Sequence, residues 1–369
     1  MKKVQKVEYM FEFLRVFLGI VIAFLACIVI IVLISEESAG DAVYNFVVGP
    51  FMSPRRFGQV LARYAPYLLT GCGMCFIYAC GRFSLISEGI INIAPIFALI
   101  VMFKTPLMTN LPQFVNLIII IVVCAIAGGA FAMVPAFGRE KLGANEMVTS
   151  TIMNYMCLYL ALWLLKSTVA DRGQSFLTSP IFPDNMRFTR YWGDTNFTSA
   201  IWVAVIGVVV ACILFYRTPL GAKIRMCGSN LSFATYSGIN AKKMMYLAQL
   251  IGGLFAGVAA AVDCFGTYNS YYYQILTNVG MDGLLCAVMA RKQPLFVPLT
   301  AFVLAYIRTA AAVLNANTNI PIELVTMLQA VIVLFVAAEE FLGKTKRRVI
   351  FNISREEEAV KVKEAKSNA

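Results

Sequence analysis

Long apolar runs separated by short polar segments dominate this chain of 369 residues. Many runs approach the length of about 20 residues that an α-helix needs to cross the hydrocarbon core of a bilayer. The pattern predicts an all-α integral membrane protein with about ten transmembrane helices. The predicted segments are residues 16–34, 62–80, 86–103, 114–137, 147–165, 198–216, 244–263, 279–290, 294–313 and 321–342.

Two polar, glycine-containing stretches interrupt the apolar pattern where the membrane interior is expected. They are GRFSLISEG (residues 81–89), which contains Glu88, and TNVGMDG (residues 277–283), which contains Asp282. Each joins a span to a shortened one, and the spans between them make the two stretches enter from opposite sides. This pattern is typical of inverted repeats whose discontinuous helices meet at a central site. We therefore expect two broken helices in an inverted-repeat arrangement.

A charged island, TPLGAKIRMCGSNLSFATYSGIN (residues 218–240), lies between two apolar runs. Its cap residues predict two short helices. Thr218 is expected to cap the first, with Pro219 at the first helical position, where a missing N–H costs nothing. Gly228 is expected to end that helix in a left-handed conformation.

The second short helix of the island is expected to begin after Asn230 and to end at Gly238, and Asn240 is expected to cap the membrane helix that follows. Phe233 and Tyr236 share one face of it because they are three residues apart. An aromatic face on a short helix outside the membrane favours docking into the groove of a partner protein. The alternative is an interfacial loop whose aromatic rings lie among the lipid headgroups.

Charge is sparse and unevenly distributed. The chain is 60% hydrophobic and 14% charged, with a net charge of +11, whereas soluble domains are about 25% charged. Most of the basic residues fall on one alternating set of connecting segments, which predicts cytoplasmic N- and C-termini. The excess of basic over acidic residues therefore indicates orientation in a lipid membrane, not nucleic-acid binding. The expected organisation is an N-terminal arm (1–15), a transmembrane domain (16–343) with a cytoplasmic coupling loop (217–243) and an extracytoplasmic loop (166–197), and a cytoplasmic tail (344–369).

Two segments on the opposite side are long. Residues 35–61 are expected to carry an amphipathic piece that lies on the bilayer surface through Phe46, Val47, Phe51 and Phe57. Residues 166–197 are polar and contain prolines and a tryptophan. A loop of that length commonly has a function, such as receiving a partner. The alternative is a plain cap over the bundle.

Enzyme motifs are absent from the sequence. Histidine does not occur, which excludes HExxH and a histidine-based triad, and no GxSxG elbow is present. A phosphate-binding loop ending at Gly343, Lys344 and Thr345 would need a glycine where Ala338 stands. We therefore expect no ATP hydrolysis by this chain and no cofactor. The CxxC pair at residues 72–75 has neither a second CxxC nor histidines, so packed buried cysteines explain it better than a metal site.

Ionisable residues inside a membrane are costly and are therefore candidates for function. The candidates are Glu88, Glu146, Asp263, Asp282, Arg308 and Glu323. Glu88 and Asp282 lie at the broken segments, where a carboxylate either lines a solute pathway or caps the N-terminus of a half-helix. Glu146 begins a span in GANEMVTSTIMNY, and helix capping is its alternative role.

Other polar residues on the same helices complete the candidate pathway. Asn154 and Tyr155, further along the span that begins near Glu146, are suited to hydrogen bonding with either a solute or a neighbouring helix. The expected translocation pathway comprises Glu88, Asn92, Asn145, Glu146, Asn154, Tyr155 and Asp282. No catalytic or metal-binding residues are expected.

Three strings together resemble a known transporter group. GANEMVTSTIMNY, the 218–240 loop and NVGMDGLLCAVMARKQP resemble, in order and spacing across residues 60–340, permease subunits of ATP-driven importers for nucleosides and simple sugars. That group also includes ribose and branched-chain amino-acid permeases. The resemblance implies that the loop contacts an ATPase. The implied coupling residues are Gly228, Asn230, Phe233, Tyr236 and Gly238.

This chain departs from the group's pattern at three positions. Ser84 and Ile90 stand where the group usually has asparagine and glutamine, and Leu231 stands where proline is common. The first two departures suggest a changed solute preference, and the third suggests a reshaped ATPase contact.

The resemblance implies a permease subunit in a bacterial inner membrane. Its expected partners are ATP-binding subunits on the cytoplasmic face, a second permease subunit, identical or homologous, and an extracytoplasmic solute-binding lipoprotein. The alternative is an ion-coupled secondary transporter that uses Glu88 and Asp282, because broken helices fit it equally well. A non-transporting scaffold or receptor is the least favoured class, since intramembrane carboxylates are expensive without a use.

Overall fold

The computed structural model describes residues 39–105, 111–171, 173–174, 176–191 and 195–317, with residues 25, 28 and 29 as isolated positions. Residues 45–313 form one compact unit, and the remaining described residues belong to a second unit. The N-terminal arm, the tail, Glu323 and the predicted spans 16–34 and 321–342 lie outside the described residues, apart from those three positions.

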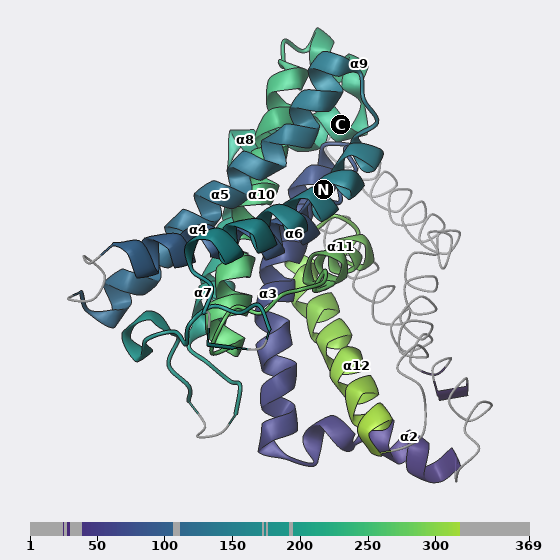
Figure 1. Ribbon diagram of the computed structural model, residues 1–369. Helices are drawn as coiled ribbons and strands as arrows, with labels where there is room; N and C mark the ends of the chain where they lie inside the picture. The colour runs from purple at the N-terminus through teal and green to yellow at the C-terminus, as the bar shows by residue number, and fades with distance from the viewer. Residues whose placement is uncertain are drawn as a thin grey trace, which may run out of the picture. The chain divides into compact units, whose positions relative to one another are not determined.

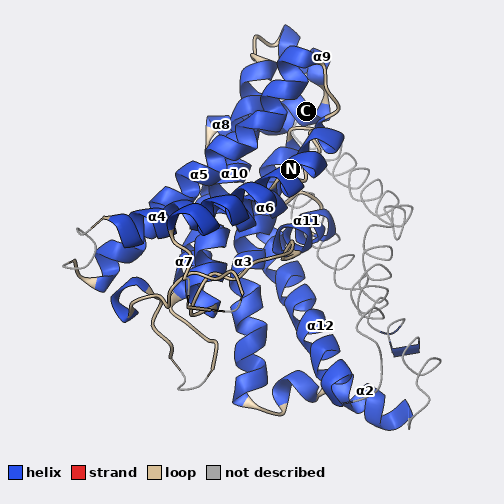
Figure 2. Cartoon of the chain, viewed as in Figure 1, coloured by secondary structure: helices blue, strands red, loops and turns tan. Residues whose placement is uncertain are grey.

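In the described part of the chain the regular elements are all helices (Figures 1 and 2). The long ones are α3 (Pro54–Ala79), α4 (Ser87–Lys104), α5 (Gln113–Leu142), α6 (Glu146–Thr168), α7 (Ala200–Cys212), α10 (Ala241–Thr267) and α12 (Val297–Asn317). The short ones are α2 (Ala39–Val47), η1 (Gly49–Phe51), η3 (Asp184–Met186), the π-turn η4 (Ile213–Arg217), α8 (Pro219–Ser229), α9 (Leu231–Tyr236), α11 (Val279–Met289) and η5 (Pro294–Phe296).

Seven helical segments within the described residues are long and apolar enough to cross a bilayer. They are α3, α4, α5, α6, α7 with its π-turn, α10, and η5 with α12. Each coincides with a predicted span, and the predicted segment 279–290 forms the short helix α11. The all-helical class is therefore confirmed, while the total of about ten spans and the inverted repeat stay predictions.

Close contact between helix backbones organises the core of the 45–313 unit. α5 crosses α10 at Gly253 and Gly257, where an added Cβ would lie 2.6 Å from the Gly128 carbonyl oxygen and 2.1 Å from the Cys124 carbonyl oxygen. Small residues four apart permit this approach, and in lipid such packing is a main source of helix association. Cys72 and Cys75 are fully buried thiols of α3, in line with a packing role.

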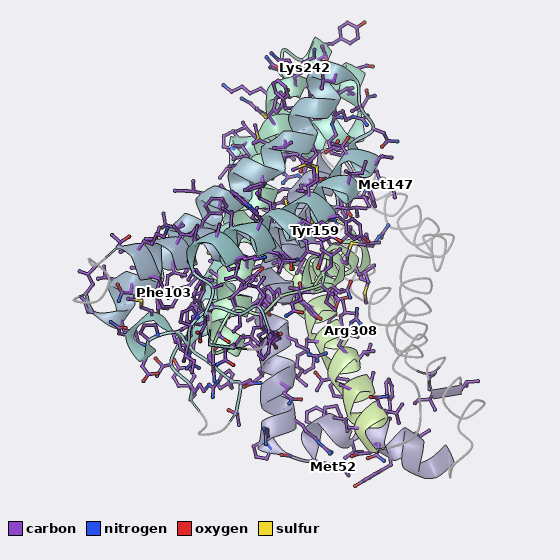
Figure 3. The ribbon with its side chains drawn as sticks, viewed as in Figure 1. Met52, Phe103, Met147, Tyr159, Lys242 and Arg308 are labelled. Atoms are coloured by element: carbon purple, nitrogen blue, oxygen red, sulfur yellow. The ribbon has the colours of Figure 1, made fainter. Side chains whose placement is uncertain are left out.

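The two ends of the 45–313 unit differ in content. One end, called here the α9 end, holds α8, α9 and Lys242 (Figures 1 and 3). The opposite end, called here the long-loop end, holds Met52 and the connection between α6 and α7 (Figure 3). Tyr216 of η4 donates a hydrogen bond to Gln293, which places the turn after α11 at the α9 end as well.

The connection between α6 and α7 packs tightly against the chain after α10. Its backbone at Ser179 and Phe182 donates hydrogen bonds to the carbonyls of Tyr271 and Asn269. Phe182, at 1% exposure, belongs to the core. Arg187 donates to the Asn269 side chain, and its burial, with the nearby guanidinium of Arg190, lowers the pKa of Arg187. These contacts favour the cap alternative for this loop, and a partner-receiving role stays a prediction.

Part of the amphipathic piece expected in residues 35–61 packs against protein, whereas the sequence predicts that it lies on the bilayer surface. Phe46 is fully buried, and the Val47 carbonyl accepts a hydrogen bond from Tyr306 of α12. Gly49 packs so closely on Val313 that an added Cβ would lie 2.8 Å from its methyl group. The segment therefore packs on α12 through these residues, because their burial against protein removes them from any lipid surface. Phe51, at 59% exposure, remains on the outside.

Candidate functional site

The helices α4 and α11 begin next to each other within the bundle. α11 has 11 residues, a rise of about 16 Å. Its first turn lies beside Tyr67, midway along α3, because the Tyr67 hydroxyl donates to Asp282. An added Cβ on Gly280 would lie 2.4 Å from the backbone nitrogen of Glu88. The first turns of α4 and α11 are thus in direct backbone contact, at a place called here the α4/α11 junction.

Glu88 caps the N-terminus of α11 from the first turn of α4. Its carboxylate accepts hydrogen bonds from the backbone N–H groups of Asn278 (2.6 Å), Gly280 (2.8 Å) and Met281 (3.2 Å), and from the Thr277 hydroxyl (3.2 Å). The first N–H groups of a helix have no partner inside it, and the helix dipole favours an anion there. Of the two roles expected for Glu88, these contacts match capping.

Asn154 of α6 does the same for the N-terminus of α4. Its Oδ1 accepts a hydrogen bond from the Gly89 N–H (2.9 Å), and its Nδ2 donates to the Leu85 carbonyl (3.0 Å). One turn earlier, the Ser150 hydroxyl accepts from the Leu85 N–H (3.0 Å). α6 therefore holds the extended residues that lead into α4, and the N-termini of α4 and α11 each receive a side-chain acceptor from another helix.

Asn92 lies one turn into α4 and is fully buried. Its Nδ2 donates to the Glu88 carbonyl (2.9 Å), and its own carbonyl accepts from the Tyr271 hydroxyl (2.8 Å). Among the described residues its Oδ1 has no hydrogen-bond partner. Asn92 thus connects α4 to the segment between α10 and α11.

Asp282 forms an intramembrane ion pair that joins three helices. Its carboxylate accepts from the Tyr67 hydroxyl of α3 (2.5 Å) and from Nε and Nη2 of Arg308 on α12 (both 2.9 Å). Figure 3 shows Arg308 on α12. A two-point contact between a guanidinium and a carboxylate is strong and directional. Asp282 therefore ties the first turn of α11 to both neighbouring helices.

Glu146 belongs to a different place, a charged cluster at the α9 end. Its carboxylate lies 3.6 Å from Arg82 and 3.8 Å from Arg139 and accepts a hydrogen bond from Gln249. Arg82 also pairs with Glu140. With 3% exposure, Glu146 fixes the start of α6 against the end of α5, α10 and the α3–α4 turn.

Asn145 and Tyr155 complete the expected pathway residues. Asn145 caps α6, because its side chain accepts from the Met147 N–H (3.0 Å). Tyr155 is 52% exposed on α6, on a face shared with the exposed Ile152 and Tyr159. The structure thus brings together Glu88, Asn92, Asn154 and Asp282, but it places Asn145 and Glu146 at the α9 end and Tyr155 on an exposed surface.

The expected first helix of the 218–240 island is present as α8, with one correction. Thr218 caps it by accepting from the Gly221 N–H (3.2 Å), and Pro219 is its first residue. Gly228 does not end it in a left-handed conformation, because α8 continues to Ser229. An added Cβ at Gly228 would lie 1.9 Å from the Ala79 carbonyl oxygen. Glycine is required there for close packing of α8 on α3.

The second helix of the island, α9, follows the prediction closely. Asn230 caps it by accepting from the Phe233 N–H (3.0 Å), and Asn240 caps α10 in the same way. Gly238 is left-handed at φ 79°. The N–H groups of Gly238 and Ile239 donate to the carbonyls of Thr235 and Ala234, which is a Schellman ending.

α9 has almost no buried surface of its own. Ala234 is its one buried residue, whereas Phe233 is 58% and Tyr236 is 92% exposed. A cavity of about 570 Å³ lies beside the helix, lined in part by Leu231, Thr235 and Ile239. The expected aromatic face is thus exposed at the α9 end, and the hollow beside α9 is lined by both apolar and charged side chains.

Sequence reasoning missed the partners of the buried charges. The sequence does not mark Tyr67 as a site residue, and it marks Arg308 only as an ionisable residue within a span. The available signal was the opposite sign of the two intramembrane charges, Asp282 and Arg308, which predicts pairing in an apolar medium. Nothing local in the sequence pointed to Gln249 or Arg82 as neighbours of Glu146.

Seven described helices that are long and apolar enough to cross a bilayer, with a capped two-helix loop at one end, are features of a multi-pass membrane protein. The family model described as "Branched-chain amino acid transport system / permease component" matches residues 56–337. The chain belongs to this family.

Several curated relatives match over most of their length. The chain is 24% identical over 327 residues to the guanosine ABC transporter permease protein NupP of Bacillus subtilis, covering 85% of this chain and 90% of the relative. It is 23% identical to the nucleoside ABC transporter permease protein NupB of Lactococcus lactis, covering 78% and 80%. It is 22% identical to the glucose ABC transporter permease protein TsgB13 of Haloferax volcanii, covering 80% and 79%.

Proposed function

We propose that this chain is the transmembrane subunit of an ATP-driven importer that translocates a small polar solute, a nucleoside or a simple sugar. The single observation that carries the proposal is α9, a capped helix with exposed Phe233 and Tyr236 on a permease-family domain. A helix with so little buried surface gains stability by inserting its aromatic face into a partner groove. The names of the relatives support the solute class.

The proposed partners follow from the two ends of the unit. ATP-binding subunits dock on residues 217–243 at the α9 end, which is the cytoplasmic face, and hydrolyse the ATP. A second permease subunit, identical or homologous, completes the path, and an extracytoplasmic solute-binding lipoprotein delivers solute to the long-loop end. The importer lies in a bacterial cytoplasmic membrane, with both termini of this chain in the cytoplasm. Basic residues at the α9 end, among them Lys223, Lys242 and Arg291, support this orientation.

The contacts of the two carboxylates give no support to ion-coupled transport. Glu88 is held by four donors and Asp282 by Tyr67 and a two-point pair with Arg308. A coupling carboxylate must exchange its proton or ion in each cycle. Breaking these contacts in each cycle would leave the first turn of α11 unsatisfied within the membrane.

The proposal is tested by purifying the tagged chain with its co-purifying proteins in mild detergent and measuring ATPase activity. The double variant Phe233→Ala/Tyr236→Ala is compared with Phe176→Ala, an aromatic in the connection between α6 and α7 that is about as exposed as Phe233. We expect a stoichiometric ATP-binding subunit with the parent chain and with Phe176→Ala, and its loss with the double variant. An ATPase-free preparation that transports solute in an ion gradient would overturn the proposal.

A further inference from the structure

The segment that joins α10 to α11 has no regular structure. α10 ends at Thr267 and α11 begins at Val279. α10 has 27 residues, about 40 Å of rise, so it reaches from the α9 end to the long-loop end. Since α11 begins beside the middle of α3, residues 268–278 lead from the long-loop end into the interior of the bundle in an irregular conformation.

In the described part of the chain, only the two ends of this segment have backbone hydrogen bonds to protein. The Tyr271 N–H donates to Ser179, the Tyr271 carbonyl accepts from Ser179 and Thr178, and the Asn278 N–H donates to Glu88. Within the described residues, no N–H from Tyr272 to Thr277 donates a hydrogen bond to a protein acceptor. An unsatisfied backbone group costs several kcal/mol in lipid, so irregular backbone at membrane depth occurs only where protein or a water-filled cavity covers it.

The exposed side chains of the segment are both polar and apolar. Tyr272 is 45% and Ile275 is 76% exposed, and Gln274 and Asn278 are exposed as well, whereas Tyr271 and Tyr273 are buried. The amides of Gln274 and Asn278 have no hydrogen-bond partner among the described residues. Lipid contact would leave these amides as unsatisfied as the backbone. Water and polar solute are the medium that suits these two amides.

The same segment is rigidly anchored behind its exposed face. Tyr273 donates a 2.6 Å hydrogen bond to buried Asp263, and Tyr271 donates to Asn92 of α4. The Tyr272 ring meets Tyr268 edge-on at 5.1 Å and Tyr273 at 6.1 Å. An aromatic ring fixed on two sides and open on another is suited to stacking on a flat ring.

We propose that residues 272–278 form the outer half of the solute path and recognise a neutral solute that carries a flat heterocyclic ring and hydroxyl groups. Tyr272 stacks on the ring, and the Gln274 and Asn278 amides hydrogen-bond its polar edges. The exposed polar side chains of the segment are uncharged, and Glu88 and Asp282 behind it are already engaged, which favours a neutral solute. This inference rests on the proposed transport function and narrows its solute to the nucleoside class.

Cysteine accessibility tests whether residues 272–278 face water, and this test does not require that the solute be known. Tyr272, Gln274 and Asn278 are changed singly to cysteine in a Cys212→Ser background, because Cys212 is the one described cysteine that is not buried. The full complex in membrane vesicles is treated with a membrane-impermeant, quaternary ammonium methanethiosulfonate, and labelling of the background protein is subtracted. Ile181→Cys, in the long loop, is the exposed control, and Val122→Cys, on the apolar helix α5, is the lipid-facing control.

The reaction requires a thiolate, so a thiol in water reacts far faster than one in lipid. We expect the three test positions to react within about tenfold of Ile181→Cys, and Val122→Cys to react at least about 100-fold more slowly. Test positions as slow as Val122→Cys would show that lipid or a second subunit covers the segment, and would overturn the inference.

Uptake measurements test the recognition part. Guanosine and glucose serve as probes of the nucleoside and simple-sugar classes. We expect Tyr272→Ala to raise the half-saturation concentration for guanosine at least about fivefold, the low end of the effect of base stacking on an aromatic ring. Tyr272→Phe keeps the ring and should retain the parent value. Equal uptake of guanosine by both variants, or a parent chain that carries glucose and not guanosine, would overturn the recognition claim.

The two tests separate this inference from the proposed function. If the parent complex carries neither probe and binds no ATPase, the transport proposal fails, whatever the labelling pattern. If ATP-driven uptake is present but the three cysteines stay unreactive, only the inference about residues 272–278 fails.

Discussion

The α4/α11 junction and α9 contrast sharply in how their polar and apolar groups are satisfied. At the junction, the carboxylates of Glu88 and Asp282 are buried and engaged by partners from other helices. On α9, Phe233 and Tyr236 are exposed and contribute almost nothing to the fold. The buried carboxylates of Glu88 and Asp282 thus stabilise the fold. The exposed rings of Phe233 and Tyr236 are the better indication of a functional surface.

The largest expected effect comes from filling the contact at the junction. Gly280→Ala places a methyl group 2.4 Å from the Glu88 backbone, although alanine would otherwise favour the helix by about 1 kcal/mol. We expect most of the folded protein to be lost, measured by fluorescence-detected size-exclusion chromatography. Gly138→Ala, where the nearest atom is 3.8 Å away, is the matched control. Parent-like yield of Gly280→Ala would contradict the close contact.

The next effect concerns the ion pair. Asp282→Leu leaves Arg308 without its two-point partner and should destabilise the protein by about 3–5 kcal/mol, the usual cost of breaking a buried pair from one side. The double variant Asp282→Leu/Arg308→Met should be less destabilised than Asp282→Leu alone, because no unpaired charge remains. Thermal unfolding of the single and double variants in detergent gives the coupling free energy between Asp282 and Arg308. Additive losses would show that the two side chains do not depend on each other.

A smaller loss of stability is expected at Glu88. This residue gives the most direct test of the contrast between the α4/α11 junction and α9. Glu88→Gln keeps one acceptor oxygen but loses the charge that faces the α11 N-terminus. The melting temperature should fall by the equivalent of about 1–3 kcal/mol, and Glu88→Ala should lower it further. If Glu88→Gln melts like the parent and yet blocks uptake, the carboxylate serves the transport pathway directly and the contrast with α9 no longer holds.

The smallest effect on stability is expected at α9. Phe233→Ala with Tyr236→Ala should leave the free energy of unfolding within about 0.5 kcal/mol of the parent, because both rings are exposed. The same pair should abolish coupling of ATP hydrolysis to uptake in the assembled complex. A clear loss of stability in the isolated chain would place these rings in the fold instead of a partner contact.

Local rules made the two-helix loop predictable in detail. Thr218, Asn230 and Asn240 act as caps, and Gly238 is left-handed, as their positions indicate. These features depend on groups within about four residues of one another. Gly228 was assigned wrongly because the same residue type serves both helix ends and close packing, and only the contact with Ala79 distinguishes them.

The candidate pathway was less predictable, since it depends on contacts between distant residues. Polar residue type marked Glu88, Asn92, Asn154 and Asp282, which do meet, but equally marked Tyr155, which lies on an exposed face. The irregular segment after α10 was not singled out. Its glycine-free sequence carries no break signal, and only the end of α10 reveals that it lies at membrane depth.

The sequence by itself determined the helical class, the positions of the spans within the described residues, the two breaks and the caps of the loop. Hydrophobic period, helix length and capping are properties of neighbouring residues, so a single chain displays them. The tertiary structure decided which side chains satisfy the buried charges, which glycines are contact points and which helix faces stay exposed. Tyr67 and Asp282 are 215 residues apart, and no local rule joins them. Their contact follows from the packing of α3, α11 and α12 in a medium where an unpaired polar group is costly.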